Sequence, residues 1–303
     1  MASETPAGLR VLFATDGSGT ARNAYSLIRQ LVLPVMDHLT VLSVAPQSFL
    51  AGARPDPAYL LKATPAVRRS ALAESEEEAQ EAATELDPGV EVDAIARWGN
   101  PIEEILRAAR RVPADLIVLG AKGRSGLSIM LLGSVSQGVV QMSTLPVLIV
   151  RPDTDRLRKV LIGYDDSPEA KKSLNYLERF RLPKDVELVF SYVDVPLPKG
   201  QRGSRRKSME AAAAAAERNR NEDEAALAEV AKSFAAKGYR VSTEVLQAKD
   251  GQAAPALDAS ARKHKAGLII VGSRKPAPAR HYLIGSTAEK LVRHADASVL
   301  VVR

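Results

Sequence analysis

The stretch Val11-Leu12-Phe13-Ala14-Thr15-Asp16-Gly17-Ser18 joins a short apolar run to a polar turn, and it occurs twice in this chain. It returns 149 positions later as Val160-Leu161-Ile162-Gly163-Tyr164-Asp165-Asp166-Ser167. A second stretch, Val147-Leu148-Ile149-Val150-Arg151, returns 152 positions later as Val299-Leu300-Val301-Val302-Arg303. Because the copies follow in the same order at nearly the same spacing, the sequence indicates duplication of a single domain.

Duplication decides how the 303 residues are divided, since a chain of that length suits one large domain or two of ordinary size. We predict a first domain at residues 8–151 and a second at 157–303, joined by the polar link Pro152-Asp153-Thr154-Asp155-Arg156. Each domain is long enough to bury a hydrophobic core of its own.

Each half alternates apolar runs of strand length with stretches of helical spacing or helix-forming composition. Runs rich in Val, Leu and Ile are typical of strands buried on both faces of a parallel sheet. The expected strands include residues 39–44, 90–96, 116–120, 147–150 and 188–193, and the expected helices include 21–31, 67–86, 102–111, 133–142 and 208–237. Strands that alternate with helices imply right-handed crossovers, so we predict an α/β fold with a parallel sheet in each half.

The fold class also predicts where a ligand would bind. Parallel α/β sheets hold ligands outside the carboxyl ends of their strands, at the point where the strand order reverses. In this chain those ends carry Asp16 and Asp165 after the first strand of each half, and Gly120 and Gly272 after the fourth.

Glycines are spaced regularly after the fourth strand of the first half. Two residues separate Gly120 from Gly123, and nine more precede Gly133-Ser134 at the head of an expected helix. Glycine amides can converge on phosphate oxygens, and a helix N-terminus adds free N–H groups and a partial positive charge. Ser134 has two roles open to it, a cap on its own helix or a donor to a phosphate. Alternatively, these glycines only form turns and Ser134 only caps its helix. The nine-residue spacer, the Gly133-Ser134 pair and the partial repeat of this pattern in the second half favour a loop that binds a nucleotide.

The pattern Gly120-x2-Gly123-x9-Gly133-Ser134 resembles the G-2x-G-9x-G-(S/T) ATP-binding signature of the universal stress protein family. The flanking residues 115–127 and 146–151 are similar to that family's C-terminal block, and Thr15-Asp16-Gly17-Ser18 is similar to its opening turn. The resemblance covers nearly the whole chain as two tandem copies. It implies two Rossmann-like domains, each a five-stranded parallel sheet flanked by helices, and a bound adenine nucleotide, ATP with Mg²⁺ at its phosphates.

The resemblance also implies roles for individual residues. In the first site, Asp16 and the Val44 backbone would surround the adenine, with Leu119 and Gly120 beside the ribose and adenine. The phosphates would be surrounded by Gly123, Gly133, Ser134 and Val135. The corresponding residues of the second half are Asp165, Val193, Val271, Gly272, Gly285, Ser286 and Thr287.

The second copy departs from the signature at two positions. Lys275 stands where the signature has its second glycine, and Asp166 stands where the first copy has Gly17. A side chain at position 275 would hinder the approach of the backbone to a phosphate, or its ammonium would meet the phosphate directly. Both readings stay open for the second copy, and we predict that the two sites are unequal.

Composition narrows the other classes of function. The net charge of +6 and the pI near 9.5 suit nucleic-acid binding, but aromatic residues are only 4% and no nucleic-acid motif is present, so we expect no such partner. The four histidines lack the spacing of metal ligands, so we expect no metal site. Cysteine is absent, and Met1-Ala2-Ser3-Glu4-Thr5-Pro6 has no apolar signal core, so we expect a cytoplasmic protein without a membrane segment.

Three functional classes compete. The resemblance implies a nucleotide-binding regulator of the stress response, and the alternative is an interaction scaffold of the same fold without functional nucleotide binding. An enzyme that cleaves ATP between its α- and β-phosphates would carry S-G-G-x-D-S after the first strand, where this chain has Thr15-Asp16-Gly17-Ser18-Gly19-Thr20. We predict no catalytic residue, although slow ATP hydrolysis or autophosphorylation on Ser134 stays open.

The resemblance implies partners of a further kind. In the family it names, two domains pair through their final strands, here residues 146–151 and 297–303. An open edge of such β-branched composition is a liability that proteins usually cover. We therefore expect the two tandem copies to pair within one chain, with a homodimer as a further option.

Overall fold

The computed structural model describes residues 8–32, 35–47, 64–86, 89–121, 132–152, 156–180, 182–183, 185–195, 206–248, 251–273 and 284–303. They divide into two compact units, one made mainly of residues up to Arg156 and the other mainly of residues from Leu157 onward. These units are called the first half and the second half below.

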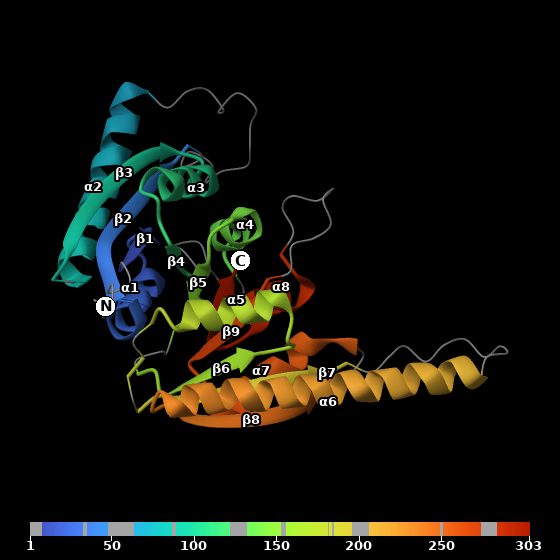
Figure 1. Ribbon diagram of the computed structural model, residues 1–303. Helices are drawn as coiled ribbons and strands as arrows, with labels where there is room; N and C mark the ends of the chain where they lie inside the picture. The colour runs from blue at the N-terminus through green and yellow to red at the C-terminus, as the bar shows by residue number, and fades with distance from the viewer. Residues whose placement is uncertain are drawn as a thin grey trace. The chain divides into compact units, whose positions relative to one another are not determined.

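The first half alternates strands with helices (Figure 1). Its elements are β1 (Leu9–Thr15), α1 (Gly19–Leu27), the π-helical turn η1 (Ile28–Val32), β2 (Met36–Pro46), α2 (Pro65–Leu86), β3 (Glu91–Gly99), α3 (Pro101–Arg111), β4 (Leu116–Gly120), α4 (Ser134–Met142) and β5 (Val147–Val150). The strands pair in parallel in the order β3-β2-β1-β4-β5. The order therefore reverses between β1 and β4, and the carboxyl ends of these two strands lie side by side.

Helices cover both faces of this sheet. The α2 helix packs on β2 and β3, α1 packs on β4 and β5, and α3 and α4 pack against each other. Right-handed crossovers require this division, with α1 and α2 on one face and α3 and α4 on the other. Strands between two helical layers must be apolar throughout, and every residue of β4 and β5 is buried.

The second half repeats the arrangement. Its elements are β6 (Lys159–Gly163), α5 (Pro168–Leu177), β7 (Glu187–Asp194), α6 (Arg206–Ala236), β8 (Arg240–Gln247), α7 (Ala253–His264), β9 (Leu268–Gly272), α8 (Ser286–His294) and β10 (Ser298–Val302). The strands pair in parallel in the order β8-β7-β6-β9-β10, which is the same topology with the same reversal between its first and fourth strands. Two five-stranded parallel sheets flanked by helices confirm the predicted α/β fold.

The observed elements differ from the predicted ones mainly at their ends. The helix expected at residues 21–31 runs as α1 and then widens into η1. Strands β2 and β7 extend by one to three residues at each end beyond the predicted ranges, and β3 begins one residue later and ends three residues later than predicted. The added residues of β2 continue the parallel pairing with β1 and β3, and two of them, Met36 and Ala45, are buried.

The turns after β1 and β6 share one backbone shape. Gly17 has φ +68°, and Asp166 at the corresponding position has φ +52°, so both lie in the left-handed region. Glycine adopts this region freely, whereas a residue with a Cβ loses roughly 1 kcal/mol there. The second copy therefore keeps the turn with a residue that must be stabilised in it by other contacts.

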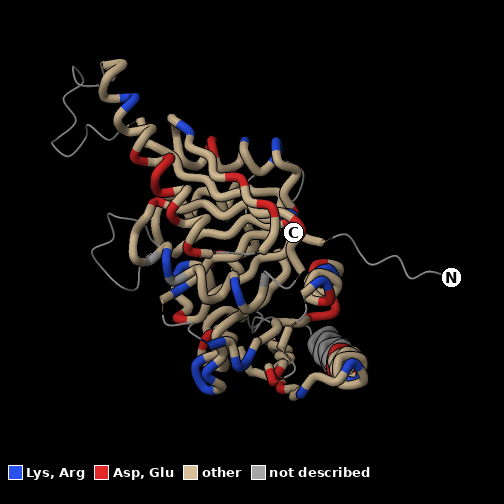
Figure 2. Tube along the Cα trace, turned by 90° about the vertical axis from the view of Figure 1, so that its left-hand side faces the viewer, with Lys and Arg blue, Asp and Glu red and all other residues tan. Residues whose placement is uncertain are grey.

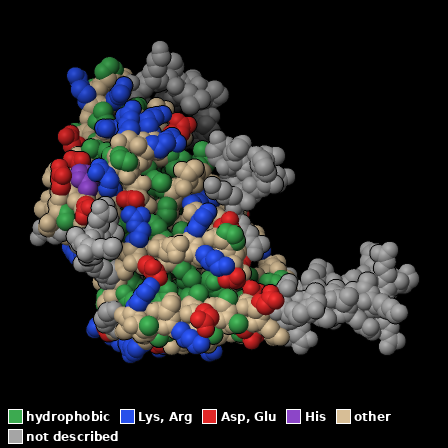
Figure 3. Space-filling model, in the orientation of Figure 1, with side chains coloured by type: hydrophobic (Ala, Val, Ile, Leu, Met, Phe, Trp, Pro, Cys, Tyr) green, Lys and Arg blue, Asp and Glu red, His purple; other side chains and the backbone are tan. Residues whose placement is uncertain are grey.

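Charges of both signs occur along the described trace of each half (Figure 2). On the face drawn in Figure 3, Lys and Arg side chains stand among Asp and Glu side chains. Within the described ranges, no helix combines the length and the apolar character needed to cross a bilayer.

Candidate functional site

A cavity of about 550 Å³ opens at the carboxyl ends of the strands in the first half. It lies where the strand order reverses, as expected for this fold class. Its walls come from the ends of β1, β2 and β4, from α2, and from the first turns of α3 and α4. The lining residues are Ala14, Thr15, Asp16, Ala21, Leu42, Val44, Ala45, Pro46, Ala71, Glu74, Ser75, Glu78, Asn100, Pro101, Ile102, Ile105, Leu119, Gly120, Gly133, Ser134, Val135 and Ser136.

The turn that carries Asp16 is held by local hydrogen bonds. The Ser18 amide donates to Asp16 Oδ1 at 3.2 Å, and the Ser18 hydroxyl caps α1 by accepting from the Ala21 amide at 3.2 Å. In the parallel register Thr15 pairs with Ser43, which brings Asp16 beside Val44 at the end of β2. The two residues that the resemblance assigns to adenine therefore lie at the same end of the cavity.

The opposite end of the cavity is formed by the N-terminus of α4. Gly133 is its N-cap and supplies no side chain to cap the helix, and Ser134 is the exposed first helical residue. Of the two roles left open for Ser134, capping its own helix is therefore not the one observed. The Ser136 hydroxyl donates to the Gly120 carbonyl at 2.7 Å and ties the helix to the end of β4. The first-turn amides of α4 are thus available to a ligand, with the partial positive charge of the helix behind them.

One face of α2 forms a third wall that sequence reasoning missed. Ala71, Glu74, Ser75 and Glu78 recur at helical spacing and all line the cavity. The Ser43 hydroxyl at the end of β2 donates to Glu78 Oε2 at 2.7 Å and fixes this carboxylate. The sequence could have indicated this wall only through the helical spacing of residues 71, 74, 75 and 78, which places them on one face of the helix.

The second half has a corresponding but smaller cavity of about 290 Å³. It is lined by Gly163, Tyr164, Asp165, Ser167, Glu169, Ala170, Ser191, Val193, Val195, Gly251, Gln252, Ala253, Ala254, Leu257, Val271, Gly272, Gly285, Ser286, Thr287, Ala288 and Lys290. Gly285 and Ser286 begin α8 as Gly133 and Ser134 begin α4, again without a side-chain cap.

The two cavities gather all described residues that the resemblance assigns to the nucleotide sites. Asp16, Val44, Leu119, Gly120, Gly133, Ser134 and Val135 line the first, and Asp165, Val193, Val271, Gly272, Gly285, Ser286 and Thr287 line the second. Gly123 and Lys275 lie outside the described residues.

Gly272 is required by packing inside the protein. A Cβ at this position would lie 2.6 Å from the backbone C and O atoms of Glu169, in the first turn of α5. The end of β9 and the start of α5 therefore touch through their backbones. The contact between Gly272 and the backbone of α5 therefore explains why position 272 is a glycine, without reference to a ligand.

A paired exchange distinguishes the cavities. In the first half, the Ile102 side chain lies over Gly138, where a Cβ would be 2.3 Å from Ile102 Cδ1. At the corresponding positions, 152 residues on, the second half has Ala254 and Lys290. Lys290 lines the cavity, and its Nζ donates to Gln252 Oε1 at 2.7 Å. The second half thus combines the small side chain of Ala254 on α7 with the long side chain of Lys290 on α8. The Lys290 ammonium has no counterpart among the lining residues of the first cavity.

Side chains stabilise the left-handed turn of the second half. Tyr164 Oη donates to Asp166 Oδ1 at 2.6 Å, and Lys171 Nζ donates to Asp166 Oδ2 at 3.0 Å. These two bonds hold the pKa of Asp166 below its ordinary value. Burial, the bond to Asp166 and the neighbouring carboxylates raise the pKa of the Tyr164 hydroxyl, so it stays a donor at neutral pH.

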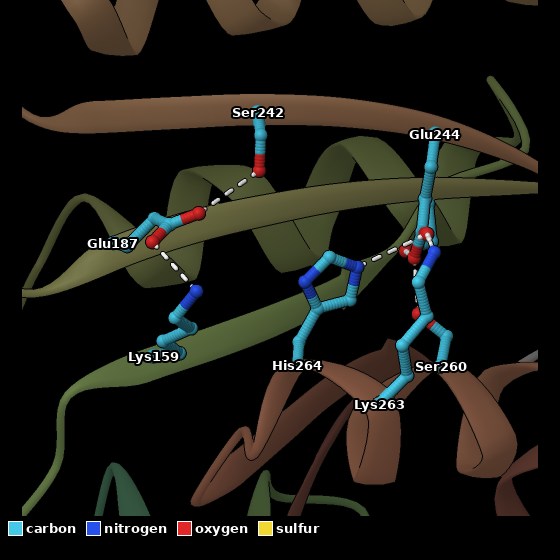
Figure 4. Close-up of polar contacts among 8 residues, drawn as sticks. Lys159, Glu187, Ser242, Glu244, Ser260, Lys263 and His264 are labelled. Atoms are coloured by element: carbon cyan, nitrogen blue, oxygen red, sulfur yellow. Dashed lines mark hydrogen bonds and ion pairs between the residues drawn. The ribbon is translucent and has the colours of Figure 1, made fainter.

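A carboxylate under α7 is connected to the second cavity. Glu244 on β8 is 15% exposed and accepts from Ser191, which lines the cavity, at 2.9 Å. Ser260 and His264 on α7 also turn toward it, with His264 Nε2 at 3.1 Å (Figure 4). Burial would raise the pKa of Glu244, but the bonds from Ser260, His264 and Ser191 outweigh it and lower this pKa. His264, at the end of α7, is therefore part of this network.

Nearby, on the same sheet, Glu187 accepts from Lys159 Nζ at 2.9 Å and from the Ser242 hydroxyl at 3.2 Å (Figure 4). Among the residues that the structure describes, His, Asp and Glu side chains form no group of three that could hold a metal ion.

Comparison with known proteins gives consistent matches in both halves. A model of the Universal stress protein family matches residues 9–151 and again residues 156–303. Universal stress protein YxiE of Bacillus subtilis is 35% identical over 148 residues, which cover 47% of this chain and 98% of that protein. Stress response protein NhaX of the same organism is 28% identical over 163 residues, covering 47% and 97%. The crystal structure of a universal stress protein from Archaeoglobus fulgidus has the same fold, with a TM-score of 0.66 at 22% identity over 97% of this chain and 96% of that one.

Proposed function

This chain belongs to the universal stress protein family, and from that premise we propose that it is a stress-response regulatory protein whose first half binds ATP. We also propose residues 8–151 and 157–303 as the bounds of its two domains. The first cavity carries the functional proposal. Its volume of about 550 Å³ falls within the range of roughly 300–1,000 Å³ typical of small-molecule sites.

Charge orients the nucleotide in this cavity. The uncapped first turn of α4, at Gly133 and Ser134, suits the phosphates because its amides and its dipole favour negative charge. The carboxylates of Asp16, Glu74 and Glu78 line the other walls and repel phosphate, so the nucleoside is directed toward β2 and α2. Mg²⁺ enters with the phosphates, because in nucleotide sites this ion is commonly held by substrate phosphates and waters together with one or two carboxylates.

The experiment is to fill the cavity from α2 without disturbing the core. Ala71 lines the cavity, whereas Ala73 is exposed on the same helix. The Ala71→Phe variant should bind ATP at least about tenfold more weakly by calorimetric titration with Mg²⁺, because the ring occupies the nucleoside end; this is a loss of about 1.4 kcal/mol. The matched Ala73→Phe variant should bind as the wild type does.

Equal ATP affinity in the wild type and in Ala71→Phe would place ATP elsewhere and refute the assignment of this cavity. A wild-type protein that binds no ATP would favour the scaffold alternative. Mass spectrometry of ligand released from freshly purified protein identifies the nucleotide independently.

The second half is proposed to bind the nucleotide more weakly or not at all. Its cavity is about half as large, at 290 Å³ against 550 Å³, and Tyr164 projects into its wall where the first half has Thr15. Titration should therefore give a stoichiometry nearer to one tight site per chain than to two. Two indistinguishable tight sites would refute this inequality.

A further inference from the structure

Ser75 on α2 carries a hydroxyl that its own helix does not use. Helical Ser and Thr side chains can donate to the carbonyl one turn earlier. In the same helix the Thr84 hydroxyl does so, to the Gln80 carbonyl at 2.8 Å. In α5 the Ser173 hydroxyl donates in the same way to the Glu169 carbonyl at 3.0 Å. Ser75 is 5% exposed, and within the ranges that the structure describes its hydroxyl has no hydrogen-bond partner.

The first cavity gives this hydroxyl access to a ligand. Ser75 is one of the residues that line the cavity. Burying a hydroxyl without a protein partner lowers stability, because the group gives up hydrogen bonds to water. Such groups are uncommon in native proteins, and each calls for an explanation. A molecule that fills the cavity can supply the missing hydrogen bond, so the hydroxyl would contribute to affinity rather than to folding.

The packing of α2 shows which part of a nucleotide would reach Ser75. This helix packs on β2 and β3 (Figure 1), whereas the uncapped turn proposed for the phosphates begins α4, which packs on β5. In the sheet, β1 and β4 lie between β2 and β5. The carboxylates of Glu74 and Glu78 line the same wall as Ser75 and repel phosphate. The nucleoside is therefore the part of the nucleotide that meets this wall.

The chemistry of a hydroxyl suits this position. It can both donate and accept hydrogen bonds, so it can pair with the polar groups of a nucleoside, and it adds no charge to the wall. We propose that the Ser75 hydroxyl binds the nucleoside of the nucleotide in the first cavity; this inference rests on the proposed function.

The second half lacks this binding group. The position that corresponds to Ser75, 149 residues on, is Glu224, and it is exposed. None of the described residues of α6 lines the second cavity. The long helix before the third strand of each half therefore forms a cavity wall in the first half alone, as far as the described residues show. A nucleoside contact from this helix is a further reason for the two sites to differ in affinity.

The test removes the hydroxyl and compares two nucleotides in the full chain. By calorimetric titration, Ser75→Ala should bind ATP about three- to tenfold more weakly than the wild type, the effect expected for the loss of one neutral hydrogen bond. Its affinity for AMP should fall by the same factor, because the contact is with the nucleoside that both nucleotides share. The matched control, Ser70→Ala, removes an exposed hydroxyl from the same helix and should bind both nucleotides as the wild type does.

A second measurement separates a binding role from a structural one. Without nucleotide, the Tm of Ser75→Ala should equal that of the wild type or exceed it by up to about 4 °C, because alanine favours the helix and leaves no hydroxyl unpaired. A clearly lower Tm would show that the hydroxyl holds the fold, and it would overturn the proposal.

The titrations contain two further outcomes that contradict the proposal. Equal ATP affinity in Ser75→Ala and Ser70→Ala would overturn it. A loss of affinity for ATP that is absent for AMP would also overturn it, because the hydroxyl would then contact the phosphates. Wild-type protein that binds neither nucleotide would refute the proposed function, and this proposal with it.

Discussion

The close approach of β9 to α5 leads to a prediction about stability in the second half. In the Gly272→Ala variant, the new methyl group would start 2.6 Å from the backbone C and O atoms of Glu169 and 2.9 Å from its Cβ. None of these atoms lies at the end of a flexible side chain, so the first turn of α5 or the end of β9 must move.

The expected magnitude follows from two opposing effects. Overpacking of this kind costs about 1–3 kcal/mol. Replacing a glycine within a strand by alanine stabilises the folded state by roughly 0.5–1 kcal/mol, because the unfolded chain loses less backbone entropy on folding. Because the clash is with backbone atoms at 2.6 Å, the overpacking cost should lie in the upper part of its range, and the net destabilisation should be about 1–2.5 kcal/mol. For a domain of this size, that lowers Tm by roughly 2–10 °C.

The assay combines two measurements of thermal unfolding, of which one reports on the first half alone. Trp98, on β3 in the first half, is the single tryptophan of the chain. In Gly272→Ala, the Trp98 fluorescence transition should stay where it is in the wild type, while differential scanning calorimetry shows the second-half transition at lower temperature. Gly19→Ala is the control, because nothing lies within 4 Å of a Cβ there. A Gly272→Ala chain as stable as the wild type would refute the packing argument.

Three further predictions concern the network under α7, the turn after β6 and the final strands. The pKa of Glu244 is lowered in the folded state, so the ionised carboxylate contributes stability above its unfolded pKa of 4.5. That contribution is lost as the pH falls through the folded pKa. In urea titrations, the stability of Glu244→Gln should therefore depend less on pH below about 4.5 than that of the wild type. Tyr164→Phe removes a donor to the left-handed Asp166 and should destabilise the second half by about 1 kcal/mol in chemical denaturation, whereas adding Asp166→Gly to that variant should recover most of the loss. The expected pairing of the final strands, which remains a prediction, implies slow hydrogen exchange at residues 148–150 and 300–302 in the monomeric protein, and fast exchange in both segments would contradict it.

The strands, and the position of a cavity at their carboxyl ends, could be predicted because their signals are local. Apolar runs such as the one that ends at Gly120 specify a buried parallel strand by themselves, and the internal repeat supplied the second copy of each element. Once the strands were placed, the topology determined that Asp16 and Gly133 would reach one cavity, since their strand ends meet at the reversal of strand order.

The contribution of α2 could not be predicted in the same way. Its buried residues are Ser75, Ala79, Ala82, Ala83 and Leu86, and only the last is a large apolar side chain. A helix that packs through small residues carries a weak periodic signal, so its rotation depends on the surfaces of β2 and β3 that it meets. The role of Gly272 was missed for a similar reason, because its close neighbour, Glu169, is remote in sequence.

The exchange of Gly138 and Ile102 for Lys290 and Ala254 has a consequence for engineering. If α8 alone were grafted into the first half, its lysine would begin in the space that the Ile102 side chain fills. The smallest part that the two copies can trade is therefore a pair of adjacent helices, α3 with α4 or α7 with α8. A recombination library built with breakpoints between the members of such a pair should lose folded chimeras that a library with breakpoints outside the pair retains.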